Sequence, residues 1–211
     1  MKNKEEIKKF AQELKIPYLL HFTHISNLES ILKWGLESRK KVDEDYENVI
    51  TNDQGRYDGR ADTISLSIAH PNDKMFFKYR ESDQDWCVLG LDPSVLWELD
   101  CLFCKHNAAD GLISHLDDDT LSKVSSFKGM YDEVNWLPSR EEQSLLGYDP
   151  TDVQAEVLVK KHIPAHKIFG VIVSSRQVKK NIAEFTGDIK VAINEPNKYV
   201  YATRTYRRRW Q

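Results

Sequence analysis

Hydrophobic and polar positions along the chain predict helices and strands that alternate. Apolar residues recur at helical spacing over 3–14, which indicates an amphipathic helix, and Pro17 ends it. Strict alternation over 63–68 predicts a strand with one buried face. The short apolar runs at 18–22 and 86–91 predict two further strands. The first half of the chain is therefore expected to contribute both helices and sheet strands.

Polar residues indicate where the next elements begin and end. Ser26 and Glu29 have the spacing of a capping box, with serine at the N-cap and glutamate three residues later. They predict a helix that begins at Ser26 and that Gly35 ends. The segment 38–61 that follows is polar and contains glycine, so it predicts a loop.

The second half of the chain predicts the same mixture of elements. The segment 108–147 combines acidic residues, serines and short apolar clusters, and it predicts helices and loops. We expect further helices at 93–99 and 176–185, and strands at 156–159, 168–173 and 189–193. Strands interleaved with helices predict an α+β fold. Because no repeat or linker divides the chain, a single domain over 1–211 is expected.

Composition limits the classes of protein to which the chain can belong. Its 211 residues are 40% hydrophobic, which is enough for one well-buried domain. With 30 basic and 33 acidic residues the formal net charge is -3, so any nucleic-acid site must be a local patch. No apolar run approaches the ~20 residues of a membrane helix, and the charged N-terminus lacks a signal-peptide core. A cytoplasmic protein without a membrane segment is expected.

Three cysteines raise the question of metal or redox chemistry. Cys101 and Cys104 have the C-x-x-C spacing of zinc and redox sites. No second pair of ligands lies near them, and the apolar residues between them are typical of a strand. A zinc deaminase would also need a His-x-Glu partner, which is missing. Reduced, buried thiols without a metal are therefore expected.

A polar loop that runs into an apolar strand contains the strongest candidates for chemistry. Gln154 and Glu156 stand two positions apart where the strand 156–159 begins. Side chains two positions apart share one face of a strand, so we expect both to point into one cleft. Such a pair resembles the catalytic strand of the mono-ADP-ribosyltransferases. The alternative interpretation is a solvated strand edge.

A second group of polar residues surrounds the first strand and the helix after it. His21 and Thr23 offer an imidazole and a hydroxyl that can hold a ribose or a carboxamide. Backbone N–H groups near a helix start can bind phosphate. Arg39, Arg56 and Arg60 can neutralise a pyrophosphate. These features suit a dinucleotide site, with a structural histidine and a solvated loop as the alternative interpretation.

In their order along the chain, these segments resemble the DarT family, toxin ADP-ribosyltransferases that modify bases in single-stranded DNA. The segment 21–39 is similar to that family's NAD-binding element, and 154–164 is similar to its catalytic strand. The segments 63–68 and 71–80 resemble the middle motif of the guanine-modifying branch, because the aromatic stretch of the thymine-modifying branch is missing. The resemblance covers almost the whole chain. It implies an ADP-ribosyltransferase-like fold, with central β-sheets around an NAD cleft and flanking helices.

The resemblance also implies roles for individual residues. Glu156 is expected to be the catalytic acid, and Arg60 is expected to act at the pyrophosphate, with Arg56 and Arg39 as alternatives. NAD is expected as a co-substrate, and no metal is expected. The remaining candidates for NAD binding are His21, Phe22, Thr23, Asn27, Gly35, Leu36 and Ser65, and those for substrate binding are Gln154, Lys74, Met75 and Tyr148.

The implied reaction transfers ADP-ribose from NAD to a base, guanine being favoured, and releases nicotinamide. Glu156 is expected to stabilise the positive charge that develops on the ribose. A single strand presents an unstacked base at the least cost. Tyr131 and Tyr148 are candidates to stack on that base, whereas Trp136 is expected in the core. The tail 201–210 interleaves arginines with aromatics and is expected to bind phosphates and bases.

An enzyme that modifies the DNA of its own cell is toxic, so the resemblance implies a reversing partner. That partner is expected to be a macrodomain antitoxin like DarG, which removes ADP-ribose from DNA. Three alternatives stay open: thymine as the target base, a protein or RNA acceptor, and a binding module whose NAD site is vestigial.

Overall fold

Among the residues that the structure describes, seven strands form one sheet in the order β5-β6-β3-β1-β4-β8-β9. Neighbouring strands are antiparallel except β8 and β9, which are parallel. The computed structural model describes residues 2–45, 49, 58–80, 86–194 and 199–210. The strands are β1 (Leu19–His24), β3 (Thr63–Ile68), β4 (Trp86–Leu91), β5 (Cys101–Cys104), β6 (Glu156–Lys160), β8 (Ile168–Val173) and β9 (Lys190–Ile193).

The sheet divides in its middle. Strands β1 and β3 pair only at Leu19 with Ile68 and at Leu20 with Ser67. Beyond this seam, β1 stays paired with β4 along its whole length, and the rest of β3 is paired with β6. The half-sheet β5-β6-β3 and the half-sheet β1-β4-β8-β9 therefore diverge from the seam, and an opening forms between them.

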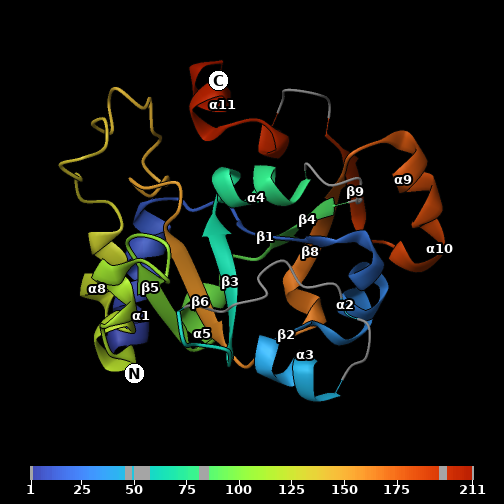
Figure 1. Cartoon of the computed structure of the whole chain (residues 1–211), viewed down its shortest axis with the longest axis horizontal. Helices are drawn as coiled ribbons and strands as arrows, with labels where there is room; N and C mark the ends of the chain where they lie inside the picture. Colours follow the sequence, from blue (N-terminus) through green and yellow to red (C-terminus); the bar gives the residue numbers. More distant parts are fainter. Residues whose placement is uncertain (1, 46–48, 50–57, 81–85, 195–198, 211) are drawn as a thin grey trace.

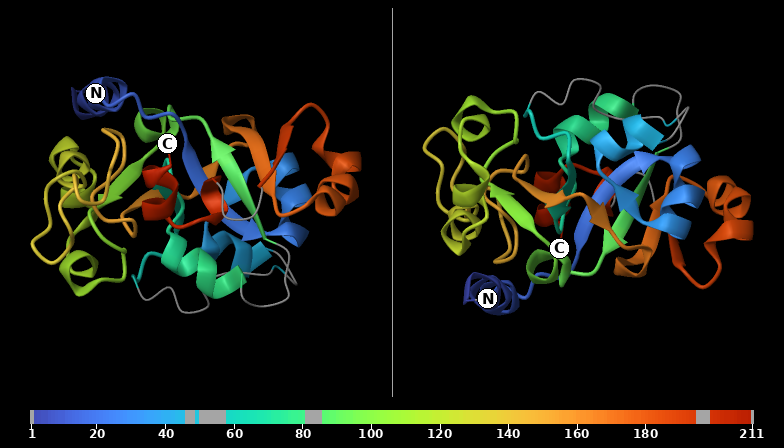
Figure 2. Two further views of the ribbon diagram at one scale, coloured as in Figure 1. Left: turned by 90° about the horizontal axis from the view of Figure 1, so that it is seen from above. Right: turned by 90° about the horizontal axis from the view of Figure 1, so that it is seen from below.

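Helices surround the sheet on several sides (Figures 1 and 2). In Figure 1, α1, α5 and α8 gather around β5 and β6, α9 and α10 lie beside β9, and α4 and α11 lie at the top. A two-stranded sheet joins β2 (Leu36–Glu37) to β7 (His162–Ile163). The helices are α1 (Lys2–Glu13), α2 (Leu28–Trp34), α3 (Arg39–Asp45), α4 (Asp73–Arg80), α5 (Val95–Glu98), α6 (Gly111–Ser114), α7 (Asp118–Leu121), α8 (Val124–Gly129), α9 (Arg176–Asn181), α10 (Ala183–Thr186) and α11 (Arg204–Arg209), with 3-10 turns η1 (Ile25–Asn27), η2 (Ala165–Lys167) and η3 (Tyr199–Tyr201).

Hydrophobic burial explains why the central strands hold together. Every residue of β4 is buried, and β6 is buried except at Lys160. Helix α1 buries Ile7 and Ala11, and its Phe10 ring meets Phe127 edge-on at 5.1 Å between ring centres. Full burial of a side chain such as Phe127 stabilises the fold by about 1.5–3 kcal/mol. The α+β prediction, with a central sheet and flanking helices, is confirmed.

Three predictions about the helices are wrong, each for a physical reason. The capping box at Ser26 does not form, because His24 accepts a hydrogen bond from the Ser26 N–H across a 3-10 turn and α2 begins at Leu28. Helix α3 lies inside the segment predicted as a loop, and since it buries no residue it has no apolar face to detect. The helix expected over 176–185 is two short helices that meet at Ile182.

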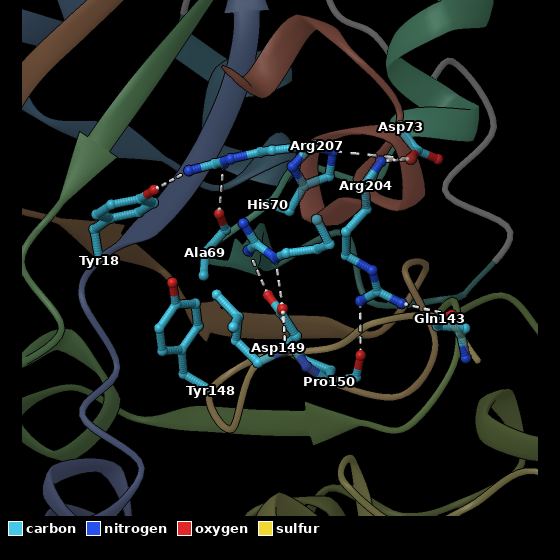
Figure 3. A network of polar contacts seen from close by, with 12 residues as sticks. Tyr18, Ala69, His70, Asp73, Gln143, Tyr148, Asp149, Pro150, Arg204 and Arg207 are labelled. Atoms are coloured by element: carbon cyan, nitrogen blue, oxygen red, sulfur yellow. Dashed lines mark hydrogen bonds and ion pairs between the residues drawn. The ribbon is translucent and has the colours of Figure 1, made fainter. Parts of the chain in front are cut away.

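An ion pair between buried side chains attaches the C-terminal helix to the loop that leads into β6 (Figure 3). The guanidinium of Arg208 contacts both carboxylate oxygens of Asp149, at 2.7 Å from Nε and 2.6 Å from Nη2. Both side chains have no exposed surface. A bidentate pair of this kind fixes the relative orientation of the two groups, because two parallel hydrogen bonds must form together.

Arg204 adds contacts to the same loop and extends this network to the start of α4 (Figure 3). Its Nη1 donates to the Pro150 carbonyl at 2.6 Å, and its Nη2 donates to the Thr151 carbonyl at 2.9 Å. Its backbone N–H donates to Asp73, the first residue of α4, at 2.7 Å. The C-terminal helix therefore holds both the loop before β6 and the start of α4.

The prediction that the tail binds DNA with its arginines is largely wrong. Arg204 and Arg208 are buried, and Arg207 donates to the Tyr18 hydroxyl and to the Ala69 carbonyl. These three guanidinium groups find their oxygen partners within the protein, so a phosphate would have to displace them. Only the opposite face of α11, with Tyr206, Arg209 and Trp210, is exposed.

We expect Asp149→Ala to lower the free energy of unfolding by about 3–5 kcal/mol, because it leaves the buried Arg208 charge without its carboxylate. Equilibrium unfolding in urea measures this change. The matched control is Asp119→Ala, which removes an exposed partner of Lys123 and should leave the urea midpoint close to that of the wild type. Equal effects of the two substitutions would contradict the structural role of the buried pair.

A second prediction concerns His70, whose two ring nitrogens are buried and form no well-made hydrogen bond with the described residues beyond a weak contact with the Ala202 backbone. Burial, and then the charges of Arg207, Arg204 and Arg208, hold its pKa well below the usual 6.5, while an Asp73 oxygen lies 3.8 Å from Nε2. The unfolded chain binds this proton near pH 6.5, so the folded state loses stability as pH falls below about 6.5.

We therefore expect His70→Gln to reduce the dependence of stability on pH between about 6.5 and 5. The wild type should lose up to about 1.4 kcal/mol per pH unit through this group, and His21, whose pKa burial also lowers, should add a loss in the same direction. Urea unfolding at several pH values measures the slope. A slope that the substitution leaves unchanged would show that His70 is not the responsible group.

Candidate active site

A cleft of about 650 Å³ lies where β1 and β3 diverge. Its volume is in the range of sites that enclose a small ligand or cofactor. Residues from β1, α2, β3 and α4 line it, together with the turn at 107–109 and the start of β6. The predicted site residues that line it are His21, Phe22, Thr23, Asn27, Gly35, Leu36, Arg39, Ser65, Met75, Gln154 and Glu156.

His21 bridges the two half-sheets just past the seam. Its Nδ1 lies 2.9 Å from the Ser65 carbonyl oxygen on β3. Burial lowers the pKa of His21, so the ring is neutral at pH 7, and Nδ1 carries the proton because a carbonyl can only accept. Nε2 is therefore left as an acceptor. Next along β1, the buried Thr23 hydroxyl accepts a hydrogen bond from the Asn27 side chain at 3.1 Å.

Gly35 and Leu36 form a turn that depends on close backbone contact. Gly35 has φ of 96°, and a Cβ at this position would lie 2.3 Å from the Ile163 carbonyl oxygen. Glycine is required for both reasons. Leu36 then pairs with Ile163 in the two-stranded sheet, and β7, which contains Ile163, begins two residues after the end of β6. The predicted NAD-binding turn and the predicted catalytic strand are thus joined by backbone contacts.

Glu156 is the first residue of β6 and is only 7% exposed, yet it lines the cleft. The Ala108 N–H donates to its Oε2 at 2.7 Å, which fixes the direction of the carboxylate. Across the sheet it is paired with Cys104, whose thiol pKa burial raises to about 12. The thiol beside Glu156 is therefore uncharged, and the acidic residues that line the cleft are Glu156, Asp58 and Glu37.

Gln154 also lines the cleft, but the argument that placed it there was wrong. It lies in a turn before β6 rather than on the strand, so alternation of side chains does not apply. Asp152 holds this turn: one of its carboxylate oxygens accepts from the Gln154 N–H at 2.9 Å, and the other contacts His106 Nδ1 at 2.9 Å. Side-chain contacts, and not strand geometry, bring the two predicted residues together.

The structure separates two of the three candidate arginines. Arg39 lines the cleft, and its Nε donates to Asp43 at 2.6 Å. Arg60 is not among the lining residues; its Nε donates to Asp118 at 3.0 Å and its Nη2 to the Leu116 carbonyl. Arg56 lies outside the described residues. Of the two arginines that are described, Arg39 has the position expected of a pyrophosphate ligand.

The predicted substrate-binding residues are also divided. Met75 lines the cleft, whereas the exposed Lys74 and the half-buried Tyr148 are not among its lining residues. Tyr148 instead packs against the Arg208 guanidinium, at 5.6 Å from the ring centre. These two positions differ from the predicted ones because Lys74 points away on α4 and Tyr148 belongs to the C-terminal network.

Among the aromatic candidates, the expectations for Tyr131 and Trp136 are reversed. Tyr131 is packed against Phe10 and Phe127, and burial raises the pKa of its hydroxyl. Trp136, expected in the core, is 63% exposed and lies over His106 at 5.3 Å between ring centres. Trp136 is thus the aromatic ring that remains available beside the Gln154 turn.

Several lining residues were not predicted from the sequence. Asn72 and Asn107 lie on turns, and the Ala108 N–H is a backbone group that no side-chain pattern reveals. Ser67 is different, because the sequence pairs it with Ser65 on one face of the alternating segment 63–68, and both serines line the cleft.

The two cysteines of the C-x-x-C segment lie inside the fold. Cys101 and Cys104 are buried and unpaired, and burial raises the pKa of each thiol to about 12. Within the described ranges, no group of three or more His, Cys, Asp or Glu side chains is arranged to hold a metal ion. None of the described helices combines the length and apolar character needed to cross a membrane.

Comparison with known proteins gives a family and a set of similar folds. Residues 20–201 match the family described as "DarT: ssDNA thymidine ADP-ribosyltransferase, DarT". Comparison with curated proteins gave no significant match.

Three solved structures are similar to this chain. Thermosipho africanus DarTG in complex with ADP-ribose has 16% identity and a TM-score of 0.63 over 85% of this chain. Thermus sp. 2.9 DarT in complex with ADP-ribosylated ssDNA has 16% identity and a TM-score of 0.61 over 85% of this chain and 95% of its own. The same protein with carba-NAD+ has 15% identity and a TM-score of 0.56, over 90% and 99% of the two chains.

The chain spans 50% of the Thermosipho protein that it matches. At these identities the structures establish a shared fold, whereas the match over residues 20–201 establishes the family. The expected resemblance is confirmed at the level of the family, and the description names thymidine and gives no support to the guanine-modifying branch. The chain belongs to the DarT family of single-stranded DNA ADP-ribosyltransferases.

Proposed function

We propose that this protein transfers ADP-ribose from NAD to a base in single-stranded DNA and releases nicotinamide. The observation that carries the proposal is Glu156, a buried carboxylate with a fixed direction at one end of a cleft that His21 and Thr23 line from β1. The family match supports the same chemistry. Similar DarT proteins have been solved with carba-NAD+ and with ADP-ribosylated ssDNA.

NAD is assigned to the side of the cleft built from β1, α2 and β2. Nε2 of the neutral His21 accepts a hydrogen bond from a ribose hydroxyl, because Nδ1 already donates to the Ser65 carbonyl. Backbone of the Gly35-Leu36 turn lies against the nucleotide, since glycine lets the chain approach closely. Arg39 binds the pyrophosphate. Phe22, Thr23 and Asn27 complete this side.

Glu156 supplies the chemistry of the transfer. Its carboxylate hydrogen-bonds the ribose 2′-hydroxyl and stabilises the oxocarbenium charge that develops at the anomeric carbon. The bond from this carbon to nicotinamide breaks, and its electron pair leaves with nicotinamide. A nitrogen of the base then bonds to the same carbon, and Glu156 accepts the proton that this nitrogen loses. Gln154, beside it, orients the base.

The acceptor base has two candidates, each with its own support. Thymidine is the base named in the family description. Guanine is indicated by the sequence of β3 and α4, which lacks the aromatic stretch expected of a thymine-modifying protein. Met75 on α4 lines the cleft at this point, and Lys74 beside it is exposed where it can meet a phosphate of the strand.

A role as a toxin follows from the same chemistry. Modified bases block the use of the DNA as a template, so a cell that makes this protein needs a partner that reverses the reaction. The similarity to a DarTG protein supports a DarG-like macrodomain antitoxin as that partner.

The first test of the proposal uses labelled NAD and four single-stranded oligonucleotides, each lacking one base. Mass spectrometry should detect ADP-ribose on all but one of them. Loss of the adduct only without thymine would assign thymidine, and loss only without guanine would assign guanine. No adduct on any oligonucleotide would overturn the DNA acceptor, and protein and RNA acceptors would then be compared in the same assay.

The second test is the substitution Glu156→Gln, which keeps the size of the side chain and an oxygen for the Ala108 N–H. The transfer rate should fall on the order of a hundred- to thousand-fold, because the negative charge opposite the developing cation is lost. Calorimetric affinity for NAD should change little. Glu29→Gln, an exposed position on α2, is the matched control. A rate within a few-fold of the wild type would refute the role of Glu156.

A further inference from the structure

Asn72, in the turn before α4, presents a buried donor at the cleft. The residue lines the cleft and is only 2% exposed. Its Oδ1 accepts from the Met75 N–H at 3.2 Å, and its backbone N–H donates to Ser67 Oγ at 3.1 Å. The contact with Met75 decides which end of the amide is oxygen, so the other end is the NH₂ group. Within the part of the chain that is described, Nδ2 has no hydrogen-bond partner.

An unpaired buried donor costs free energy, so a structure that keeps one calls for an explanation. Asn72 is fixed from both sides and cannot easily turn its amide to water. Before it, Ala69 has φ of 58°, a region that alanine rarely adopts, and the turn there directs the chain back from β3. After it, Asp73 accepts from the Arg204 N–H. A ligand atom that accepts a hydrogen bond would satisfy the donor.

The position of Asn72 limits which ligand that is. Asn72 is hydrogen-bonded to Ser67 on β3. The residue before Ser67, Leu66, is paired with Val157 on β6, and the two strands are antiparallel. Ser67 and Glu156 therefore lie at the same end of the β3–β6 ladder. On the other side, Asn107 Nδ2 donates to the Met75 sulfur at 3.6 Å. The next residue, Ala108, donates its N–H to the Glu156 carboxylate. Asn72 therefore stands at the end of the cleft where the transfer takes place.

We infer that Asn72 Nδ2 donates a hydrogen bond to a carbonyl oxygen of the acceptor base and thereby disfavours adenine. The inference rests on the proposed function. Thymine, guanine and cytosine all carry ring carbonyl oxygens, whereas adenine has none, so a single donor discriminates against adenine. The nicotinamide carboxamide offers the same chemistry. The base is favoured because Asn72 shares its wall with Met75 and the Asn107 turn, away from the Gly35-Leu36 turn.

The test compares Asn72→Asp and Asn72→Ser with the wild type. Both substitutions keep an oxygen that can cap α4, and neither keeps an NH₂ group in place. Transfer to single-stranded DNA, measured as kcat/KM for the oligonucleotide, should fall about tenfold or more in both variants. The affinity for NAD, measured by calorimetry, and the thermal unfolding temperature should stay near their wild-type values. Asn135→Asp, an exposed position, controls for the added charge.

Every other result overturns the assignment. A parallel loss of NAD affinity in both variants would mean that the donor serves the nicotinamide carboxamide. A loss in Asn72→Asp alone would be an effect of the new charge beside Glu156. Unchanged kcat/KM in both variants would mean that Asn72 only caps α4. If the wild type itself modifies no oligonucleotide, the proposed function fails first and the assignment of Asn72 falls with it, before any variant is compared.

Discussion

The short seam between β1 and β3 is the constraint on which the rest of the structure depends. Two paired positions join the half-sheets, and the divergence beyond them makes the cleft. A continuous β1–β3 ladder would close this space with backbone hydrogen bonds. Because the seam is so short, other contacts must hold the halves at a fixed spacing. The His21 ring reaches the Ser65 carbonyl across the gap, and β2 pairs with β7 at the far end.

The C-terminal helix supplies the remaining constraint. Buried arginines connect α11 to the loop before Gln154 and to the start of α4, which are two walls of the same end of the cleft. An ion pair removed from water adds little net stability, yet it tolerates few geometries. The main effect of the Arg208–Asp149 pair is therefore to fix the position of α11 relative to the loop before β6, and its net contribution to stability is small. Without this helix, the loop before Gln154 and the start of α4 would lose the contacts that connect them.

The sequence predicted secondary structure correctly where a pattern of residues depends only on the local backbone geometry. The alternation over 63–68 and the glycine after α2 predicted β3 and the end of that helix, because each follows from backbone geometry. It failed where distant charges decide the outcome. The tail arginines were predicted to form a DNA-binding arm. Their own segment does not show that Asp149 and the carbonyls of 150–151, which are distant in the sequence, bind them in the fold. Gln154 reached the cleft through Asp152 rather than through strand alternation.

Two residues with buried polar atoms that form no well-made hydrogen bond to the described residues, Asn72 and His70, lie on the turn that joins β3 to α4. Ala69 on the same turn has a positive φ. Each of these features lowers stability, and together they surround one wall of the cleft. Such costs persist when the surrounding structure enforces them, as the Arg204 and Arg207 contacts do here. The wall is thus rigid before a ligand arrives, and a base that binds there need not order it.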